Sequence, residues 1–367
     1  MIDINGYEIS KAFTGGEPVN AIYSFGVKVW PVDQPISFGG LKFTALEAGS
    51  FGMEHNGTNA TTTKPYISYS KDGVNWIEWD YTTIPVDAGD VVYFKGVNDS
   101  IGRSLNDYST FTSTGKISAS GNIMSLLYGD DFEGKLDLSG KNICFYRLFY
   151  NCKSLTNAPE LPATTLSNSC YRQIFDGCTK LTTAPELPAT KLAFMCYGSM
   201  FQGCTSLTTA PELPATELKG VCYQQMFRGC SSLTTAPELP ATKLETGCYN
   251  DMFRNCASLT TAPELPATTL STNCYSGMFY GCTSLTTAPE LPATELAGDC
   301  YLNMFSGCTK LNYVKANFTT EPSSKYTSYW LDGVASTGTF VANSSATWTT
   351  SISRNESTVP AGWTIQK

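Results

Sequence analysis

Residues 181–206, LTTAPELPATKLAFMCYGSMFQGCTS, decide how this chain folds, because nearly the same stretch recurs along it. The recurrence fills residues 155–310 with six full 26-residue units. Each unit opens on a leucine, and these leading residues are Leu155, Leu181, Leu207, Leu233, Leu259, Leu285 and Leu311. A period of this length is typical of folds in which each repeat is one supersecondary unit that stacks on the next.

Within one unit, the sequence predicts a short strand, an extended crossing and a short helix. The two prolines of the Ala-Pro-Glu-Leu-Pro run exclude a helix there and remove two backbone donors. Cys196, Met200 and Phe201 stand at spacings of four and five, which favours one face of a helix of under three turns. Gly203 suits its left-handed end. Because one unit cannot bury its apolar side chains alone, we expect a stacked solenoid with a continuous core.

The unit end Met-Phe-Gln-Gly-Cys-Thr-Ser-Leu, from Met200 to Leu207, resembles BspA-like leucine-rich repeats. The 26-residue unit and its Ala-Pro-Glu-Leu-Pro run depart from the usual pattern of that family, which leaves the curvature open. The resemblance implies a leucine-rich-repeat α/β solenoid over residues 128–310. The segment Leu136–Cys152 would be a degenerate first coil that caps the stack.

All fourteen cysteines belong to the repeat, in two series with the same period. A disulfide across the predicted helix is excluded, because its ends would lie about 12 Å apart. No Cys-x-x-Cys motif or neighbouring histidine favours a metal site. We therefore expect free thiols that fill small core positions as apolar residues. The two series are Cys144, Cys170, Cys196, Cys222, Cys248, Cys274 and Cys300, then Cys152, Cys178, Cys204, Cys230, Cys256, Cys282 and Cys308.

Residues 35–127 contain no repeat, and short β-branched and aromatic runs alternate with turn signals, which predicts a β-sandwich or jelly roll. One hairpin is expected around Asp72-Gly73. The aromatic residues near it are either a sugar-stacking platform or packing between the two sheets, and the second alternative is favoured. These residues are Tyr66, Trp76, Trp79 and Tyr81. The block also resembles the β-domain that often precedes BspA-like repeats.

The two ends of the chain differ from the middle. Residues 1–34 predict a hairpin with its turn at Phe25-Gly26, too small to be stable alone. The segment from Ala21 to Pro31 is similar to a short segment at the start of many phage virion proteins, which implies a docking arm. Its candidate docking residues are Tyr23, Val29 and Trp30. The alternative is that the arm adds strands to the sandwich. Residues 311–367 predict a small β-rich cap that covers the last coil.

Composition and motifs exclude several function classes. The net charge of −8 argues against a nucleic-acid partner. No apolar segment is long enough to cross a bilayer. No catalytic motif appears, and His55 lies in a polar turn, so we expect no enzyme, no cofactor and no metal site. Glu186 and its equivalents form a row of like charges, which we expect to be solvated rather than bridged by cations.

Sequence variation between units points to a recognition surface. The positions that vary surround the predicted helix, while the Thr-Thr-Ala-Pro-Glu-Leu-Pro-Ala-Thr run hardly changes, and a varied surface on a constant frame suits binding. Free drift of solvent positions is the alternative. The candidate binding residues are Phe194, Met195, Lys219, Gln224, Gln225, Arg228, Asn250, Arg254 and Tyr280.

These features together predict a multi-domain, β-rich, non-enzymatic interaction protein. The expected function is that of a phage virion or fibre protein, assembled in the host cytoplasm, that attaches to a glycan or protein of the host surface. The arm would bind other virion proteins. The second hypothesis is a BspA-like adhesin of the bacterial cell surface, for which no export signal or anchor is visible. The sequence leaves homo-oligomer formation open.

Overall fold

The computed structural model describes residues 38–57, 64–319, 323–346, 348, 350 and 358–367, together with the backbone of Ser324, Ser351 and short strands between residues 2 and 30. The described chain is rich in β-structure, as predicted, and its helices are short. The helices are α1 (Ser125–Tyr128), the 3-10 helix η1 (Gly129–Phe132) and α2 (Ser324–Thr327). None of the helices in these ranges has the length and apolar character needed to cross a membrane.

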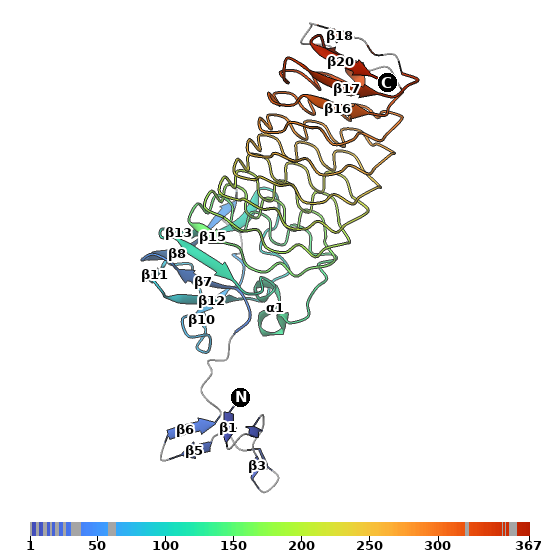
Figure 1. The fold of residues 1–367 in the computed structure, drawn as a ribbon. Coiled ribbons are helices and arrows are strands. Elements are labelled where there is room, and N and C mark those ends of the chain that lie inside the picture. The colour runs from blue at the N-terminus through green and yellow to red at the C-terminus, as the bar shows by residue number, and fades with distance from the viewer. Residues whose placement is uncertain are drawn as a thin grey trace.

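Two sheets precede the repeats and pack face to face (Figure 1). One has six strands in the order β10-β9-β12-β7-β14-β15, and the other has three in the order β11-β8-β13. Phe43 of the first sheet meets Phe51 and Phe111 of the second, with ring centroids 5.5 and 4.8 Å apart. The strands are β7 (Lys42–Ala45), β8 (Gly49–Gly57), β9 (Ser68–Ser70), β10 (Ile77–Glu78), β11 (Ile84–Val86), β12 (Val91–Lys95), β13 (Asp107–Ser113), β14 (Ile117–Ser120) and β15 (Leu155–Asn157).

The hairpin expected around Asp72-Gly73 is confirmed, because β9 pairs antiparallel with β10. Asp72 accepts hydrogen bonds from the backbone amides of Val74 and Asn75 in the connecting loop. The aromatic side chains nearby do not form one exposed platform. Trp79 is buried and stacks on Tyr81 at 5.0 Å, whereas Tyr66 is exposed. Core packing therefore accounts for Trp79, as the sequence favoured.

The sheets continue directly into a stack of coils (Figure 1), in which residues 26 positions apart in the sequence lie beside each other. β14 pairs parallel with β15, and single parallel bridges then join Asn157 to Thr183, Thr183 to Thr209 and so on along the stack. The ring of Phe111 stacks on Phe149 at 5.6 Å, and Phe149 stacks on Phe175 at the same spacing. One hydrophobic core therefore runs from the sheets through the coils.

The prediction of a helix in each unit is wrong. Residues 195–204 form successive β-turns, in which Cys196, Gly198, Met200, Gln202 and Cys204 donate backbone hydrogen bonds to the carbonyl three residues earlier. One residue in every four adopts a left-handed conformation, with φ of 56° at Met195, 53° at Ser199 and 71° at Gly203. An α-helix excludes such residues. The α part of the expected α/β solenoid is thus absent from these described segments.

The alternate backbone amides tie each coil to the next. Those of Tyr197, Ser199 and Phe201 donate to the carbonyls of Cys222, Gln224 and Met226 at 3.0, 2.8 and 2.9 Å. This division satisfies every amide from 195 to 204, half inside the coil and half between coils. The side-chain period over this segment is four instead of the 3.6 of a helix, so each pair such as Cys196–Tyr197 points into the core.

Identical side chains from successive coils stack in columns inside the core. The phenylalanine column from Phe149 to Phe305 has ring centroids 5.6–5.7 Å apart, and the rings are nearly parallel. The tyrosine column from Tyr171 to Tyr301 has spacings of 5.8–6.1 Å. The leading leucines are fully buried as well. A coil therefore gains most of its buried contacts from its neighbours, as expected of stacked repeats.

Cysteine positions are free and buried throughout, as predicted. The second series does more than fill space: the Cys204 thiol donates to the Phe175 carbonyl of the preceding coil, with Sγ and O 3.2 Å apart. Cys230, Cys256, Cys282 and Cys308 repeat this contact at 3.0–3.1 Å. No group of three metal-ligating side chains occurs in the part of the chain that the structure describes.

Thiol reactivity should separate the native protein from the unfolded chain. Burial raises the pKa of the Cys248 and Cys300 thiols to about 12, so they stay protonated at about pH 8, where free cysteine already reacts. We expect almost no reaction of native protein with Ellman's reagent. Denaturation without reductant should then release fourteen thiols. A denatured count near zero would contradict the free-thiol core.

The 26-residue offset continues past Lys310, where the sequence repeat has faded. β16 (Tyr313–Ala316), β17 (Gly338–Ala342) and β20 (Trp363–Gln366) form a parallel sheet in that order. Val314 pairs with Phe340, and Gly333 lies against Gly307, each pair separated by one repeat length. The expected β-rich end of the chain therefore extends the same stack (Figure 1). β18 (Thr350–Ser351) pairs with β19 (Val359–Pro360).

The expected hairpin in the first residues is present in the backbone. β5 (Ile22–Ser24) pairs antiparallel with β6 (Val27–Trp30) across Phe25-Gly26. The side chains of Tyr23, Val29 and Trp30 lie outside the described part of the structure. Among the described strands, those before residue 31 pair with one another and join neither larger sheet. The others are β1 (Ile2–Ile4) with β2 (Tyr7–Ile9) and β3 (Phe13–Thr14) with β4 (Glu17–Pro18).

Candidate functional site

The turn face, residues 193–203 and their equivalents, carries all nine predicted binding residues of the coils. The structure ties many of them to one another across coils instead of leaving them free. The Gln224 amide donates to Asn250 Oδ1 at 3.2 Å, and the Lys219 ammonium lies 3.1 Å from Glu245. The turn face is therefore a set of polar columns that help to hold the stack together.

Arg254 contacts side chains of its own coil and of the next one, although its Nε has no hydrogen-bond partner among the described residues. Its guanidinium lies 3.2 Å from Asp251 Oδ1 and 4.0 Å from the centroid of the Tyr280 ring in the next coil. Gln225 reaches the same aspartate from the preceding coil, with Nε2 and Oδ2 3.5 Å apart. The sequence predicts both Arg254 and Tyr280 as binding residues, and in the structure these two side chains contact each other.

Phe194, Met195 and Arg228 differ from the other predicted residues. The Phe194 side chain is 53% exposed, and Met195 and Arg228 are half-buried. Phe194 has no aromatic partner in the described part of the chain, unlike the stacked rings of the core. This exposed ring is the strongest candidate for a contact on the turn face.

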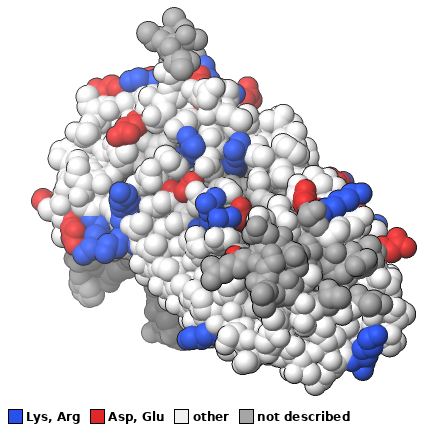
Figure 2. All heavy atoms as spheres, turned by 90° about the horizontal axis from the view of Figure 1, so that it is seen from above, with Lys and Arg blue, Asp and Glu red and all other residues white. Residues whose placement is uncertain are grey.

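Charge is distributed unevenly along these columns. Asp176 is buried at the start of the turn face and accepts a hydrogen bond from the Gln173 amide at 2.8 Å. Burial raises the pKa of its carboxyl, while Gln173 and Arg147 oppose that rise. Figure 2 views the molecule from above, and so from the end of the stack that carries β16, β17 and β20; charged side chains of both signs are scattered among the described residues of this view. This view shows no continuous basic surface of the kind that binds phosphate backbones.

The proline face is made of the six Ala-Pro-Glu-Leu-Pro runs. Neighbouring coils are less closely paired here than on the turn face. These runs are 158–162, 184–188, 210–214, 236–240, 262–266 and 288–292. No backbone hydrogen bond joins 184–189 to 210–215, although both segments are fully described. The two prolines of each run lack the amide that such a bond needs. Adjacent runs are therefore separated by grooves.

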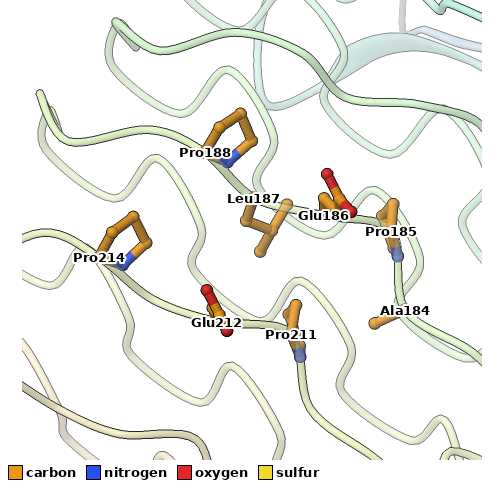
Figure 3. Close-up of a pocket in the computed structure, with 8 residues that line it drawn as sticks. All are labelled: Ala184, Pro185, Glu186, Leu187, Pro188, Pro211, Glu212 and Pro214. Atoms are coloured by element: carbon orange, nitrogen blue, oxygen red, sulfur yellow. The ribbon is translucent and has the colours of Figure 1, made fainter.

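Three such grooves follow one another along the stack. Their volumes are about 460, 400 and 340 Å³, from the groove beside Leu136 onward. Figure 3 shows the middle one, with Pro185 and Pro188 of one run facing Pro211 and Pro214 of the next. Leu187 is buried at its base, and the carboxylates of Glu186 and Glu212 are exposed at its edge.

The sequence contained a signal for these grooves. Each run holds two residues that cannot donate a hydrogen bond, repeated at the same place in six consecutive coils. That pattern predicts a gap in the pairing between coils, but the size of the gap depends on how the flanking bridges hold the coils apart. From the sequence alone, we expect only a solvated row of glutamates on the proline face.

No protein-family model, curated protein or solved structure matches this chain. The site is therefore argued from its own chemistry. Apolar proline walls, a buried leucine base and exposed carboxylates line each groove.

Proposed function

We propose that this chain is a non-enzymatic attachment protein. It is built as a BspA-like leucine-rich-repeat solenoid between a β-sandwich and a C-terminal β-rich cap. The observation that carries the proposal is the recurrence of one groove at three successive steps of the stack. Similar sites repeated along the stack hold a repetitive ligand through many weak contacts, and their combined strength far exceeds that of one.

The setting we propose is a phage virion or fibre, assembled in the host cytoplasm, with a host-surface glycan or protein as the ligand. Residues 1–34 bind other virion proteins through Tyr23, Val29 and Trp30. Among the described strands, the early ones pair with one another and join no larger sheet, which supports a docking arm because a hairpin of this size needs a partner surface. The second candidate is a BspA-like adhesin of the bacterial surface, which the same grooves would serve.

Deleting two whole units, residues 207–258, tests attachment. The remaining coils keep their register because the units are nearly identical, so the shortened protein should fold. We expect its binding to intact bacterial cells that the full chain binds to fall by roughly tenfold or more, since avidity depends on the number of sites. The unreactive cysteines of the shortened protein report that its core is intact. Unchanged binding by a folded, shortened protein would overturn the proposal.

Labelling with an antibody against residues 38–367 separates the two settings. Labelled phage particles support the virion protein, and a labelled bacterial envelope supports the adhesin. In the first case, removal of residues 1–34 should abolish incorporation into particles while cell binding by the free protein persists. Incorporation without the arm would contradict the docking role.

A further inference from the structure

The glutamates of the proline face are exposed, yet they do not vary. Glu160, Glu186, Glu212, Glu238, Glu264 and Glu290 are the same residue in all six units. The exposed position five residues further on, occupied by Lys191 in one unit, alternates among threonine, lysine and glutamate. The exposed glutamate is therefore retained in every unit together with the rest of its run, whereas the position five residues further on changes.

Ion pairing within the described chain does not account for the retained glutamates. Within the described part of the chain, no lysine or arginine pairs with Glu186, Glu212, Glu238 or Glu264. These glutamates occupy the same position in successive coils, so their like charges repel one another. A row of repelling charges with no partner in the described chain is suited to a cation from outside it.

The last coil shows how the row holds a cation. Lys315 lies on β16, which runs beside the final Ala-Pro-Glu-Leu-Pro segment and is bound to it by two backbone hydrogen bonds: Ala288 donates to the Tyr313 carbonyl at 3.0 Å, and Leu291 to that of Lys315 at 3.1 Å. The Lys315 ammonium lies 2.9 Å from Glu290 Oε1. This segment runs parallel to the last run, and it shows one lysine–glutamate contact at the end of the proline face.

We propose that the grooves of the proline face bind an extended peptide segment of another protein that carries lysines at alternate positions. Alternate side chains of an extended strand lie on one face about 6.6 Å apart. The stacked rings in the core of successive coils are 5.6–6.1 Å apart. Each ammonium meets one glutamate, and the aliphatic stems of the lysines lie against the proline walls. A metal ion fits less well, because no three ligating side chains converge in the described residues.

This inference rests on the proposed attachment function and names the chemistry of its ligand. The test uses the full chain and a fluorescent peptide of alternating lysine and threonine that is long enough to span three coils. We expect it to bind, and to bind more weakly as salt is raised. A peptide of the same composition with its lysines in adjacent pairs should bind less well, and the lysine-acetylated peptide should not bind.

The matched variants carry equal changes in charge on different faces. The triple variant Glu186→Gln, Glu212→Gln and Glu238→Gln should lower the affinity for the alternating peptide by roughly tenfold. The control Glu54→Gln, Glu78→Gln and Glu295→Gln alters exposed glutamates that lie outside the proline face, and it should leave the affinity nearly unchanged. Equal losses in both variants would show unspecific charge attraction and overturn the inference.

Two further outcomes would also overturn it. One is no binding of the alternating peptide by the wild-type chain. The other is stronger binding of a chitosan oligomer, which would assign the grooves to an amino polysaccharide. If the wild-type chain attaches to cells and the proline-face triple variant attaches equally well, the inference fails while the attachment function stands.

Discussion

Phe227→Ala is expected to lower the free energy of unfolding by about 3–5 kcal/mol. Phe227 is fully buried, and its ring lies between Phe201 and Phe253 at 5.6 Å from each. Truncation removes contacts with two neighbouring coils at once. Identical columns on both sides hold the backbone in register, so the cavity has little room to collapse.

Phe194→Ala is the matched control, because it makes the same truncation at an exposed ring of the same stack. We expect it to change stability by no more than about 0.5 kcal/mol. Urea denaturation followed by tryptophan fluorescence and far-UV circular dichroism measures both variants. Similar losses for the two would contradict the buried column.

Gly203→Ala should cost about 1–2 kcal/mol of stability, through the backbone and not through crowding. The added Cβ would meet Gly177 only at 3.7–3.8 Å, an ordinary contact distance, but φ at this position is 71°. A left-handed residue with a Cβ is strained unless its side chain tolerates that conformation. The loss therefore measures the turn conformation itself.

Gly203→Asn provides the control, because Asn255 occupies the equivalent position two units further along, with φ of 61°. Asparagine tolerates left-handed backbone better than alanine. We expect Gly203→Asn to be clearly more stable than Gly203→Ala in thermal unfolding. The reverse order would favour a helix over residues 195–204, since alanine is the better helix former.

Much of the core could be read from the sequence because repetition reveals which positions stack. Leu181, Cys196, Tyr197 and Phe201 recur once in every unit, and side chains that recur with the coil period meet their equivalents in the next coil. The local backbone was harder to read. A spacing of four lies near the 3.6 of a helix. The left-handed residues include Ser199 and Met195 as well as glycines, so composition did not reveal the turns.

For the candidate site too, the sequence revealed one part and the tertiary structure decided the rest. Of the varied residues of the turn face, Phe194 and Lys219 are exposed and the others are half-buried. Contacts between coils decide their surroundings: Arg254 packs on Tyr280 from the next unit, and that pairing appears only when the coils stack. The sequence repeat also did not reveal how far the stack extends. Past Lys310 the side chains change while the backbone pairing continues, because parallel pairing depends on main-chain amides and not on which residues carry them.

The sequence by itself determined the period, the buried columns, the free thiols and the β-rich character, because each follows from which residues recur and at what spacing. Tertiary structure alone decided that the predicted helices are turns, that polar residues of the turn face bind one another, and that grooves open on the proline face. Those properties depend on the distance between neighbouring coils. That distance is set jointly by the packed rings inside and by the hydrogen bonds that the prolines are unable to make.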